Sequence, residues 1–189
     1  MVYRLHVDGA VPDDNPFVGR ADAANAKDAA YSIGHRNPQG LAKHPTTGSR
    51  WVHEHGPRGG DEINVVKAGR NYGCPILSSG INYSGTEFAE GTEREGYESP
   101  TWYWVPSIAP SGMTFVTSDR YPEWNGNLLV GSLKFNYLVL CRVDGDTVLE
   151  QEILFENIGR VRNVRQGPDG LIYVATEGNG IVRIVPPQS

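Results

Sequence analysis

The sequence predicts an all-β protein built from short antiparallel strands joined by tight turns. Turn-forming residues are abundant, with 23 glycines and 13 prolines among 189 residues, and they follow no collagen-like period. Strand-forming aromatic residues are also common, including nine tyrosines and four tryptophans. No segment longer than ten residues shows a convincing 3.6-residue apolar period. Antiparallel hairpins in series are therefore the expected architecture.

Apolar segments at regular intervals give the expected strands. Residues 1–9 open in an alternating pattern that ends at Asp8-Gly9, as if this were the last strand of a unit whose earlier strands are absent. Residues 21–30 are rich in alanine but carry no useful apolar face, so we expect a loop. Residues 76–104 are rich in Gly, Glu and Tyr and predict a long loop. The other expected strands are 50–54, 63–66, 113–117, 127–131, 137–143, 148–155, 161–165, 171–175 and 181–185.

Three turns have the chemistry of hairpin connections. Pro168-Asp169-Gly170 supplies a preset φ, a side-chain acceptor and a residue that tolerates positive φ. Asn179-Gly180 is a strong signal for a two-residue hairpin turn. Asp144-Gly145-Asp146 predicts a turn between the two strands before these.

A faint internal repeat organises these hairpins. Its copies begin near residues 40, 110 and 166, where a Gly- or Pro-containing turn precedes a strand. Such spacings fit four-stranded blades with insertions, as in a β-propeller. Three blades are too few to close a propeller, which needs at least about four. We therefore expect a chain that self-associates or is a fragment of a longer propeller.

Composition excludes several classes of protein. The formal net charge of −5 argues against a nucleic-acid binder that works through bulk charge. No run of 18 apolar residues exists, so no membrane span is expected. No signal peptide is visible at the start of the sequence. Cys74 and Cys141 can form at most one disulfide. Phosphate-binding loops, nucleophile elbows and zinc-protease motifs are missing.

The loop from Gly34 to Gly40 is the first candidate site. Glycines at both ends allow sharp turns, while Arg36 and Asn37 offer a planar cation beside an amide. This pair suits a carboxylate or a quinone-type carbonyl, because arginine donates in a fixed fork. The alternative is a surface loop with an arginine salt bridge.

The segment from His53 to Asn64 is the second. His53 and His55 would share one face of a strand, which suits a transition metal, but no third ligand at matching spacing is evident. Asp61 and Glu62 beside a glycine-rich loop suit calcium better, because calcium prefers hard oxygen ligands. A solvated acidic turn is the alternative.

Two further sets complete the candidates. Ser107 follows three aromatic residues at 102–104 that could wall a ligand pocket, or could equally be core residues. Lys134, Arg160 and Arg162 form a cationic set, and the two arginines point the same way if they lie on one strand. Such a set could hold an anion, or could be an exposed polar strand face.

Taken together and in this order, the motifs resemble the soluble pyrroloquinoline-quinone (PQQ)-dependent aldose sugar and glucose dehydrogenases, which are six-bladed β-propellers. The resemblance covers nearly the whole chain and identifies it with the C-terminal half of that fold, about three blades. The motifs are GHRNPQG from Gly34, EHGPRGGDEIN from Glu54, NYG from Asn71, GINY from Gly80, PSIAPSG from Pro106 and RNVRQGPDG from Arg162.

The resemblance implies a role for each matching residue. Arg36 and Asn37 look like the pair that contacts PQQ, and Lys134, Arg160 and Arg162 match cations that face its carboxylates. The remaining implied cofactor residues are Tyr83 and Ser107, which line the pocket. Gly56 and Pro57 match carbonyls that hold a catalytic calcium ion, and Glu62 and Tyr72 match a second, structural calcium site.

The implied reaction is oxidation of an aldose at C1 to a lactone. Calcium polarises the quinone, a histidine removes the hydroxyl proton, and hydride passes to PQQ. The family's catalytic histidine and first blades precede the start of this chain. None of His6, His35, His44, His53 or His55 lies in the matching motif, so no catalytic residue is expected here. Two residues depart from the family pattern: Cys74 replaces tryptophan, and Lys43 replaces an apolar residue.

The resemblance also sets the expected partners, which are an aldose sugar and an external electron acceptor. Family members are usually periplasmic or secreted. A fragment without its catalytic histidine is expected to be inactive alone. The alternatives are one half of a two-chain or homodimeric propeller, and a non-catalytic module that binds calcium and an anion.

Overall fold

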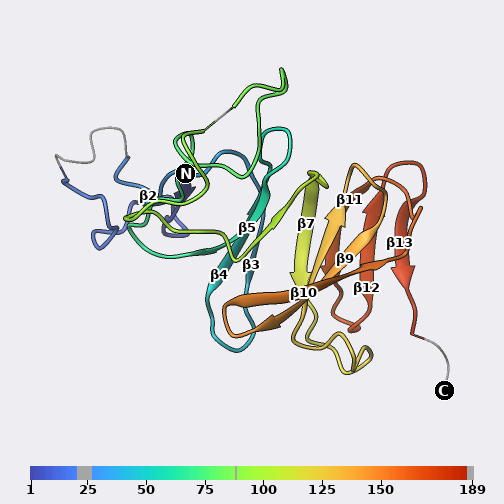
Figure 1. The fold of residues 1–189 in the computed structure, drawn as a ribbon. Coiled ribbons are helices and arrows are strands. Elements are labelled where there is room, and N and C mark those ends of the chain that lie inside the picture. The colour runs from blue at the N-terminus through green and yellow to red at the C-terminus, as the bar shows by residue number, and fades with distance from the viewer. Residues whose placement is uncertain (21–26, 88, 187–189) are drawn as a thin grey trace.

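The computed structural model describes residues 1–20, 27–87 and 89–186. These residues form thirteen strands and no helix, as the all-β prediction required (Figure 1). The predicted loop at residues 21–30 lies mostly outside the described residues, and its last residue, Ala30, begins a strand. Among the described residues no helix has the length and hydrophobicity that a membrane crossing requires.

The strands form three blade-like antiparallel sheets and one small ribbon. The first blade comprises β3 (Pro38–Lys43), β4 (Arg50–Glu54), β5 (Asp61–Val66) and β6 (Trp102–Trp104). The second blade comprises β7 (Pro110–Phe115), β8 (Leu128–Ser132), β9 (Leu138–Asp144) and β10 (Thr147–Leu154). The third blade comprises β11 (Val161–Gln166), β12 (Ile172–Thr176) and β13 (Gly180–Ile184). The ribbon pairs β1 (Val2–Tyr3) with β2 (Ala30–Ser32).

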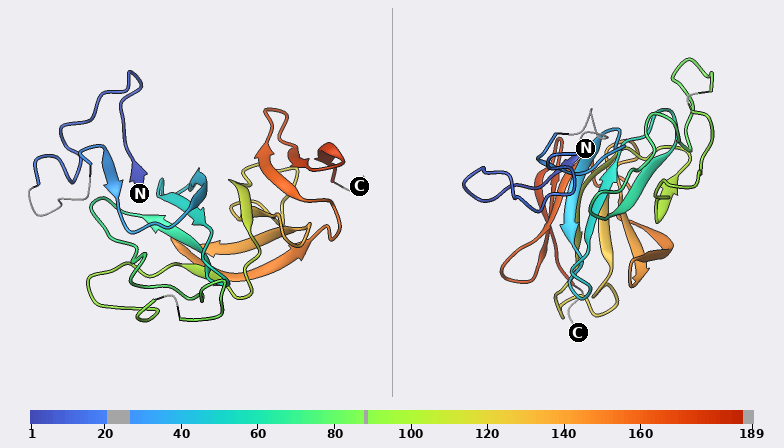
Figure 2. Two further views of the ribbon diagram at one scale, coloured as in Figure 1. Left: turned by 90° about the horizontal axis from the view of Figure 1, so that it is seen from above. Right: turned by 90° about the vertical axis from the view of Figure 1, so that its left-hand side faces the viewer.

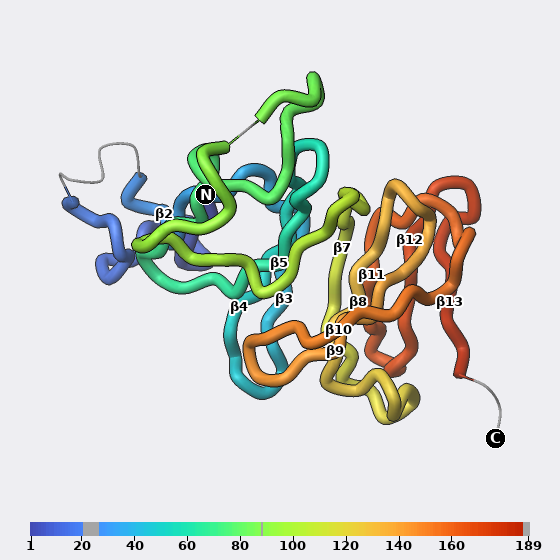
Figure 3. Tube along the Cα trace, in the orientation of Figure 1, coloured from blue at the N-terminus to red at the C-terminus, as the bar shows by residue number. Residues whose placement is uncertain are grey.

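The blades stand side by side in an arc, which is the arrangement of part of a β-propeller (Figure 2, left). The first strand of the second blade, β7, packs between β3 and β11, the first strands of its neighbours. The long connection between β5 and β6 extends toward the ribbon and rises above the first blade before it returns to β6 (Figure 3). The first strands of the three blades therefore lie together on the inner side of the arc.

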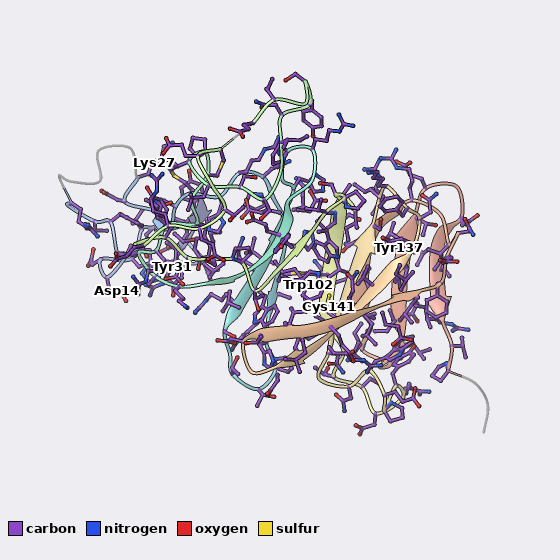
Figure 4. All side chains as sticks on the ribbon, in the orientation of Figure 1. Asp14, Lys27, Tyr31, Trp102, Tyr137 and Cys141 are labelled. Carbon is purple, nitrogen blue, oxygen red and sulfur yellow. The ribbon has the colours of Figure 1, made fainter. Side chains whose placement is uncertain are left out.

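Apolar side chains fill the spaces between neighbouring blades. One cluster joins the first and second blades; it includes Cys141, and Trp102, labelled near Cys141 in Figure 4, packs against it. Tyr137 packs against the same cluster. A second cluster joins the second and third blades through residues such as Leu129, Leu140 and Ile172. Because each cluster takes residues from two blades, neighbouring blades are stabilised together.

The tip of the β9–β10 hairpin also crosses to the first blade. Asp146 Oδ1 accepts hydrogen bonds from the hydroxyls of Thr47, at 3.2 Å, and Ser49. The main-chain carbonyl of Asp146 accepts a third from the Thr101 hydroxyl at 3.1 Å. These bonds tie the turn of one blade to two separate loops of its neighbour.

The nine strands expected between residues 50 and 185 are confirmed with small shifts of their ends. Three strands were not predicted: β2, β3 and β6. The sequence of β3, PQGLAK, has no strand-like apolar pattern, and it is extended because it pairs with β4 along its length. The loop predicted at 76–104 ends in β6, and the strand predicted at 1–9 is confined to Val2–Tyr3.

The predicted turns are present, with one correction. Gly170 (φ 78°) and Gly145 (φ 54°) lie in their hairpin turns as expected. Thr176 pairs with Gly180, so the turn between β12 and β13 consists of residues 177–179, not Asn179-Gly180. The blades begin at Pro38, Pro110 and Val161, which confirms three repeats although the third copy of the motif lies at the end of β11. Cys74 and Cys141 form no disulfide with each other.

Candidate functional site

The candidate residues gather in loops at one end of the blades, at the upper ends of β5 and β7 in Figure 1. These loops are 34–37, 55–60, 105–109, 133–137 and 155–160. Two buried carboxylates of the first blade, Glu54 and Asp61, hold the first three of these loops in place.

Glu54, at the end of β4, organises the loop that carries Arg36 and Asn37. Its Oε2 accepts the main-chain N–H groups of both residues, at 2.5 and 3.2 Å. Its Oε1 accepts from His35 Nδ1 at 2.8 Å and from Asn64 Nδ2 at 3.0 Å. Glu54 is only 3% exposed, so these four donors replace the water that its charge would otherwise require. Gly34 turns this loop at φ 75°.

Asp61, at the start of β5, braces two other loops. Its Oδ1 accepts from Gly56 N and from the Ser107 hydroxyl, each at 2.9 Å. Its Oδ2 accepts from Ala109 N at 2.7 Å, and Ala109 has a positive φ of 52°. Asp61 therefore joins the Gly-rich loop of the first blade to the segment that leads into the second blade.

The Gly-rich loop closes around a small cavity of about 10 Å³, which is the room needed by one water molecule or ion. A Cβ on Gly56 would lie 2.1 Å from Gly60 O, so only glycine fits this bend. Arg36 Nη1 donates to the carbonyls of His55 and Gly56 at 3.0 and 2.8 Å. Residues lining the cavity include Arg36, Glu54, Gly56, Pro57, Glu62, Tyr72 and Cys74.

Glu62 and Tyr72, the second expected calcium pair, both line this cavity. Burial, followed by the neighbouring carboxylate of Glu54, raises the pKa of Glu62 to about 7. Burial raises the pKa of Tyr72 to about 12. The Tyr72 hydroxyl donates to Val65 O at 2.6 Å and accepts from Lys67 N at 2.9 Å. The Tyr72 hydroxyl is therefore engaged as both donor and acceptor within the first blade.

Two open clefts adjoin the cavity. The first, of about 450 Å³, is lined in part by Pro57, Tyr83, Ser107 and Lys134. The second, of about 580 Å³, is lined by His55, Ala109, Leu133, Lys134, Asn136 and Arg160. No acidic side chain lines the second cleft among the described residues, so Lys134 and Arg160 make it a positive recess in an acidic protein.

Arg162 and Asn37 are the expected cofactor residues that these clefts and the cavity do not include. Arg162 lies on β11 and is bound to Glu177 through Nε, at 2.8 Å, and Nη2. The same carboxylate lies 3.4 Å from Arg160 Nη1. Both arginines therefore approach one carboxylate. Arg160 precedes β11, so the two do not lie on one strand as the prediction assumed. The Asn37 amide accepts a hydrogen bond from Gln39 at 2.8 Å.

The histidines do not form the metal pair considered from their spacing. His53 is fully buried, and burial, helped by the nearby His55, lowers its pKa to about 3. His55 lies beyond the end of β4, and its Nε2 is 2.9 Å from Pro110 O. No cluster of three or more His, Cys, Asp or Glu side chains suited to a metal occurs in the part of the chain that the structure describes. A cation here would depend on main-chain carbonyl oxygens together with the carboxylates that line the cavity.

Ser32, His35 and Glu54 form a hydrogen-bonded chain of side chains that resembles a hydrolase triad. Ser32 Oγ lies 2.8 Å from His35 Nε2, and the other ring nitrogen donates to Glu54. Ser32 is completely buried and lines none of the cavities described above. This hydrogen-bonded chain therefore connects the ribbon to the first blade. It gives a substrate no route to the Ser32 hydroxyl.

Four residues are important to the geometry of the site. Sequence reasoning assigned no functional role to two of them and a different role to the other two. Glu54 and Glu177 gave no signal, because their roles depend on which loop or strand lies opposite. His55 was considered only as a partner of His53. Asp61 was considered as a calcium ligand, whereas the structure uses both of its oxygens for main-chain and hydroxyl donors.

The chain was compared with known proteins. Residues 1–183 match the family model described as Glucose / Sorbosone dehydrogenase. The chain is 45% identical over 190 residues to the aldose sugar dehydrogenase YliI of Escherichia coli (strain K12), covering 98% of this chain and 50% of that protein. The chain thus spans about half the length of the curated relatives it matches.

Solved structures of similar proteins share the fold. The apo-form of the soluble aldose sugar dehydrogenase from Escherichia coli superimposes with a TM-score of 0.91 at 42% identity, over 98% of this chain and 54% of that one. The PQQ-bound form of an aldose sugar dehydrogenase from Streptomyces coelicolor gives a TM-score of 0.70 at 25% identity, over 96% of this chain and 50% of that one.

Proposed function

The chain belongs to the glucose/sorbosone dehydrogenase family, and on that premise we propose that it provides the cofactor-holding part of a PQQ- and calcium-dependent oxidoreductase. The substrate of this proposal is an aldose sugar, oxidised at C1 to a lactone, with electrons passed to an external acceptor. The observation that carries the proposal is the cation-sized cavity of oxygen ligands beside the positive cleft.

The donor set of the cavity fits calcium. The carbonyl oxygens of Gly56 and Pro57 and the carboxylate of Glu62 are hard ligands of the type that calcium prefers. The resemblance divides these residues between two calcium sites, but all of them line one cavity with room for a single ion, so we propose one site. Asp61 and Glu54 are buried nearby and add negative potential. Tyr72 would contribute its main-chain carbonyl, because its hydroxyl is engaged.

The positive cleft fits a compact ligand with several carboxylates, as PQQ is. Lys134 and Arg160 would face those carboxylates, while Tyr83 and Ser107 would line the neighbouring cleft. Glu54 holds the main chain of Arg36 and Asn37, and the Arg36 guanidinium, which lines the cavity, donates to the Gly56 carbonyl. Arg162 would act one step away, through Glu177.

When bound, the cofactor would supply the two-electron chemistry and calcium the Lewis acidity. The residues of this chain would bind, orient and charge-balance them. We assign the proton-accepting step to no histidine described here. His53 is buried and has no exposed face, His35 is engaged by Glu54 and Ser32, and His55 is engaged by Pro110.

The proposal includes the partners and the cellular location. An aldose and an electron acceptor are the expected partners, and the remaining part of a propeller, from another polypeptide or a second copy, is the expected assembly partner. The arc of three blades with free sides supports this part of the proposal. A location outside the cytoplasm rests on the family resemblance alone.

The test is calorimetric titration of the purified chain with PQQ, with and without calcium, followed by dye-linked oxidation of glucose. Calcium-dependent binding without turnover is the expected result for a cofactor half-site. Absence of PQQ binding in both conditions would overturn the proposal. Binding with turnover would show that a histidine of this chain acts as the base.

A non-catalytic module that binds calcium and an anion is the second candidate. The engaged state of His35 and His55 favours it. The two candidates differ when the missing part of a propeller is added, because only a cofactor half-site would then gain sugar oxidation.

A further inference from the structure

The hydroxyl of Ser107 lies between two oxygens and can donate its single hydrogen to one of them. Asp61 Oδ1 is 2.9 Å away and Pro57 O is 3.3 Å away. The nearer acceptor is an ionisable carboxylate and the farther one is a neutral carbonyl. Hydrogen bonds to charged acceptors are shorter and about twice as strong as neutral ones, so the hydrogen points to Asp61.

From this geometry we propose that Asp61 is the positioning residue that keeps the Pro57 carbonyl available to a cation. The proposal rests on the proposed calcium site and adds a residue that touches neither the cation nor the cofactor. Asp61 draws the Ser107 hydrogen away from Pro57 O, and through Gly56 N it also fixes the peptide just before the two ligand carbonyls.

Because Asp61 is buried, no water can replace its hydrogen bonds if the side chain is changed. Asp61 is 1% exposed, and within the described residues its three donors are two main-chain N–H groups and one hydroxyl, with no ion pair. An amide in its place keeps only one acceptor oxygen, and its NH₂ group would face donors. The Ser107 hydroxyl would then turn to Pro57 O and compete directly with a cation for that carbonyl.

The test is calcium titration by calorimetry on the full chain, without PQQ, for wild type, Asp61→Asn, Ser107→Ala and the double variant. Asp61→Asn is expected to weaken calcium binding about tenfold or more. Adding Ser107→Ala to it is expected to recover a large part of that loss, because alanine has no hydroxyl to compete. A purely structural role for Asp61 predicts no recovery.

Each outcome decides the matter. Equal calcium affinity in wild type and Asp61→Asn overturns the inference and leaves the proposed function standing. A loss that Ser107→Ala does not recover also overturns it. A wild-type chain that binds no calcium overturns the proposed function and this inference with it.

Should Asp61→Asn fail to fold, by circular dichroism, Ser107→Ala alone decides. If Asp61 already holds the hydroxyl away, this variant changes calcium affinity less than about threefold. An affinity gain of about tenfold would mean that Ser107 donates to Pro57 in the wild type, which contradicts the inference.

Discussion

The first and second blades have the same four-stranded antiparallel order, but the first blade also buries polar and ionisable side chains. In the second blade all of β8 and residues Leu138–Cys141 of β9 are buried, and nearly all of these side chains are apolar. In the first blade the buried positions of β4 and β5 include His53, Glu54, Asp61 and Asn64. The second blade thus provides packing against both neighbours, whereas the first blade uses its interior to hold loops in place.

The comparison predicts that stability and site geometry can be damaged separately. Leu140→Ala, in the second blade, should lower the free energy of unfolding by about 2–5 kcal/mol, because Leu140 is completely buried between blades. Urea unfolding followed by fluorescence measures it. The matched control is Leu149→Ala on β10, 62% exposed, which should change stability by less than about 0.5 kcal/mol. Similar losses in both would contradict the picture of a packed second blade.

The pH dependence of folding stability should come largely from buried ionisable side chains of the first blade. His53 has a pKa of about 3 when folded against 6.5 normally, so its contribution to stability is complete above pH 6.5 and is lost as the pH falls toward 3. Glu62, with a folded pKa of about 7 against 4.5, contributes below pH 4.5 and loses that contribution as the pH rises through 7. The two effects oppose each other between pH 4.5 and 6.5, and below that range His53 acts without this opposition.

Urea midpoints of wild type and His53→Gln at pH 7, 5.5 and 4 measure how much His53 contributes to the free energy of unfolding at each pH. The difference between the two proteins should shrink or reverse by several kcal/mol toward pH 4, since the shift spans more than three pKa units. A difference that is the same at all three pH values would refute the burial of a neutral His53.

Glu54→Gln should damage the site more than the fold. The amide leaves buried donors of His35, Arg36 or Asn37 without an acceptor, at a cost of about 1–3 kcal/mol. PQQ binding should fall beyond detection, because the loop carrying Arg36 loses its anchor. Glu152→Gln, which breaks only an exposed ion pair with Arg142, is the control and should cost about 0–1 kcal/mol. Unchanged PQQ affinity in Glu54→Gln would show that Glu54 does not organise the cofactor loop.

The smallest effects are expected where the second and third blades meet the cleft. Lys134→Ala and Arg160→Ala should each weaken PQQ binding about tenfold, because both cations line the positive cleft. Arg162→Ala should have a smaller effect, since Arg162 faces Glu177 and not the cleft. Calorimetric titration measures all three. An Arg162 effect larger than that of Lys134 would place the anion elsewhere.

The sequence was sufficient for the strands that carry their own pattern. Residues 127–131 and 137–143 combine apolar runs with turn residues at their ends, and both strands were located to within a residue or two. The sequence was not sufficient for β3 or β6, which are extended because a neighbouring strand pairs with them and not because of their own composition.

The residues of the candidate site also fall into those that the sequence could predict and those that it could not. Gly56 and Pro57 were found through a motif, and Lys134 and Arg160 as members of a cationic set. The structure brings all four to adjoining cavities. The Glu177 partner of the arginines was not predictable, because it depends on the register of β11 and β12, in which Val161 lies opposite Thr176. Glu54 depends similarly on the loop that folds back over β4.

The contact of Asp146 with Thr47, Ser49 and Thr101 bears on how such a fold can change over evolution. A blade looks like a module that could be exchanged between relatives at its linking loops. Here the turn of the second blade is completed by two loops of the first, so an exchanged second blade would leave donors of three hydroxyl groups without their acceptor. A recombination point between the first and second blades would therefore separate these contacts, together with the apolar cluster that the two blades share.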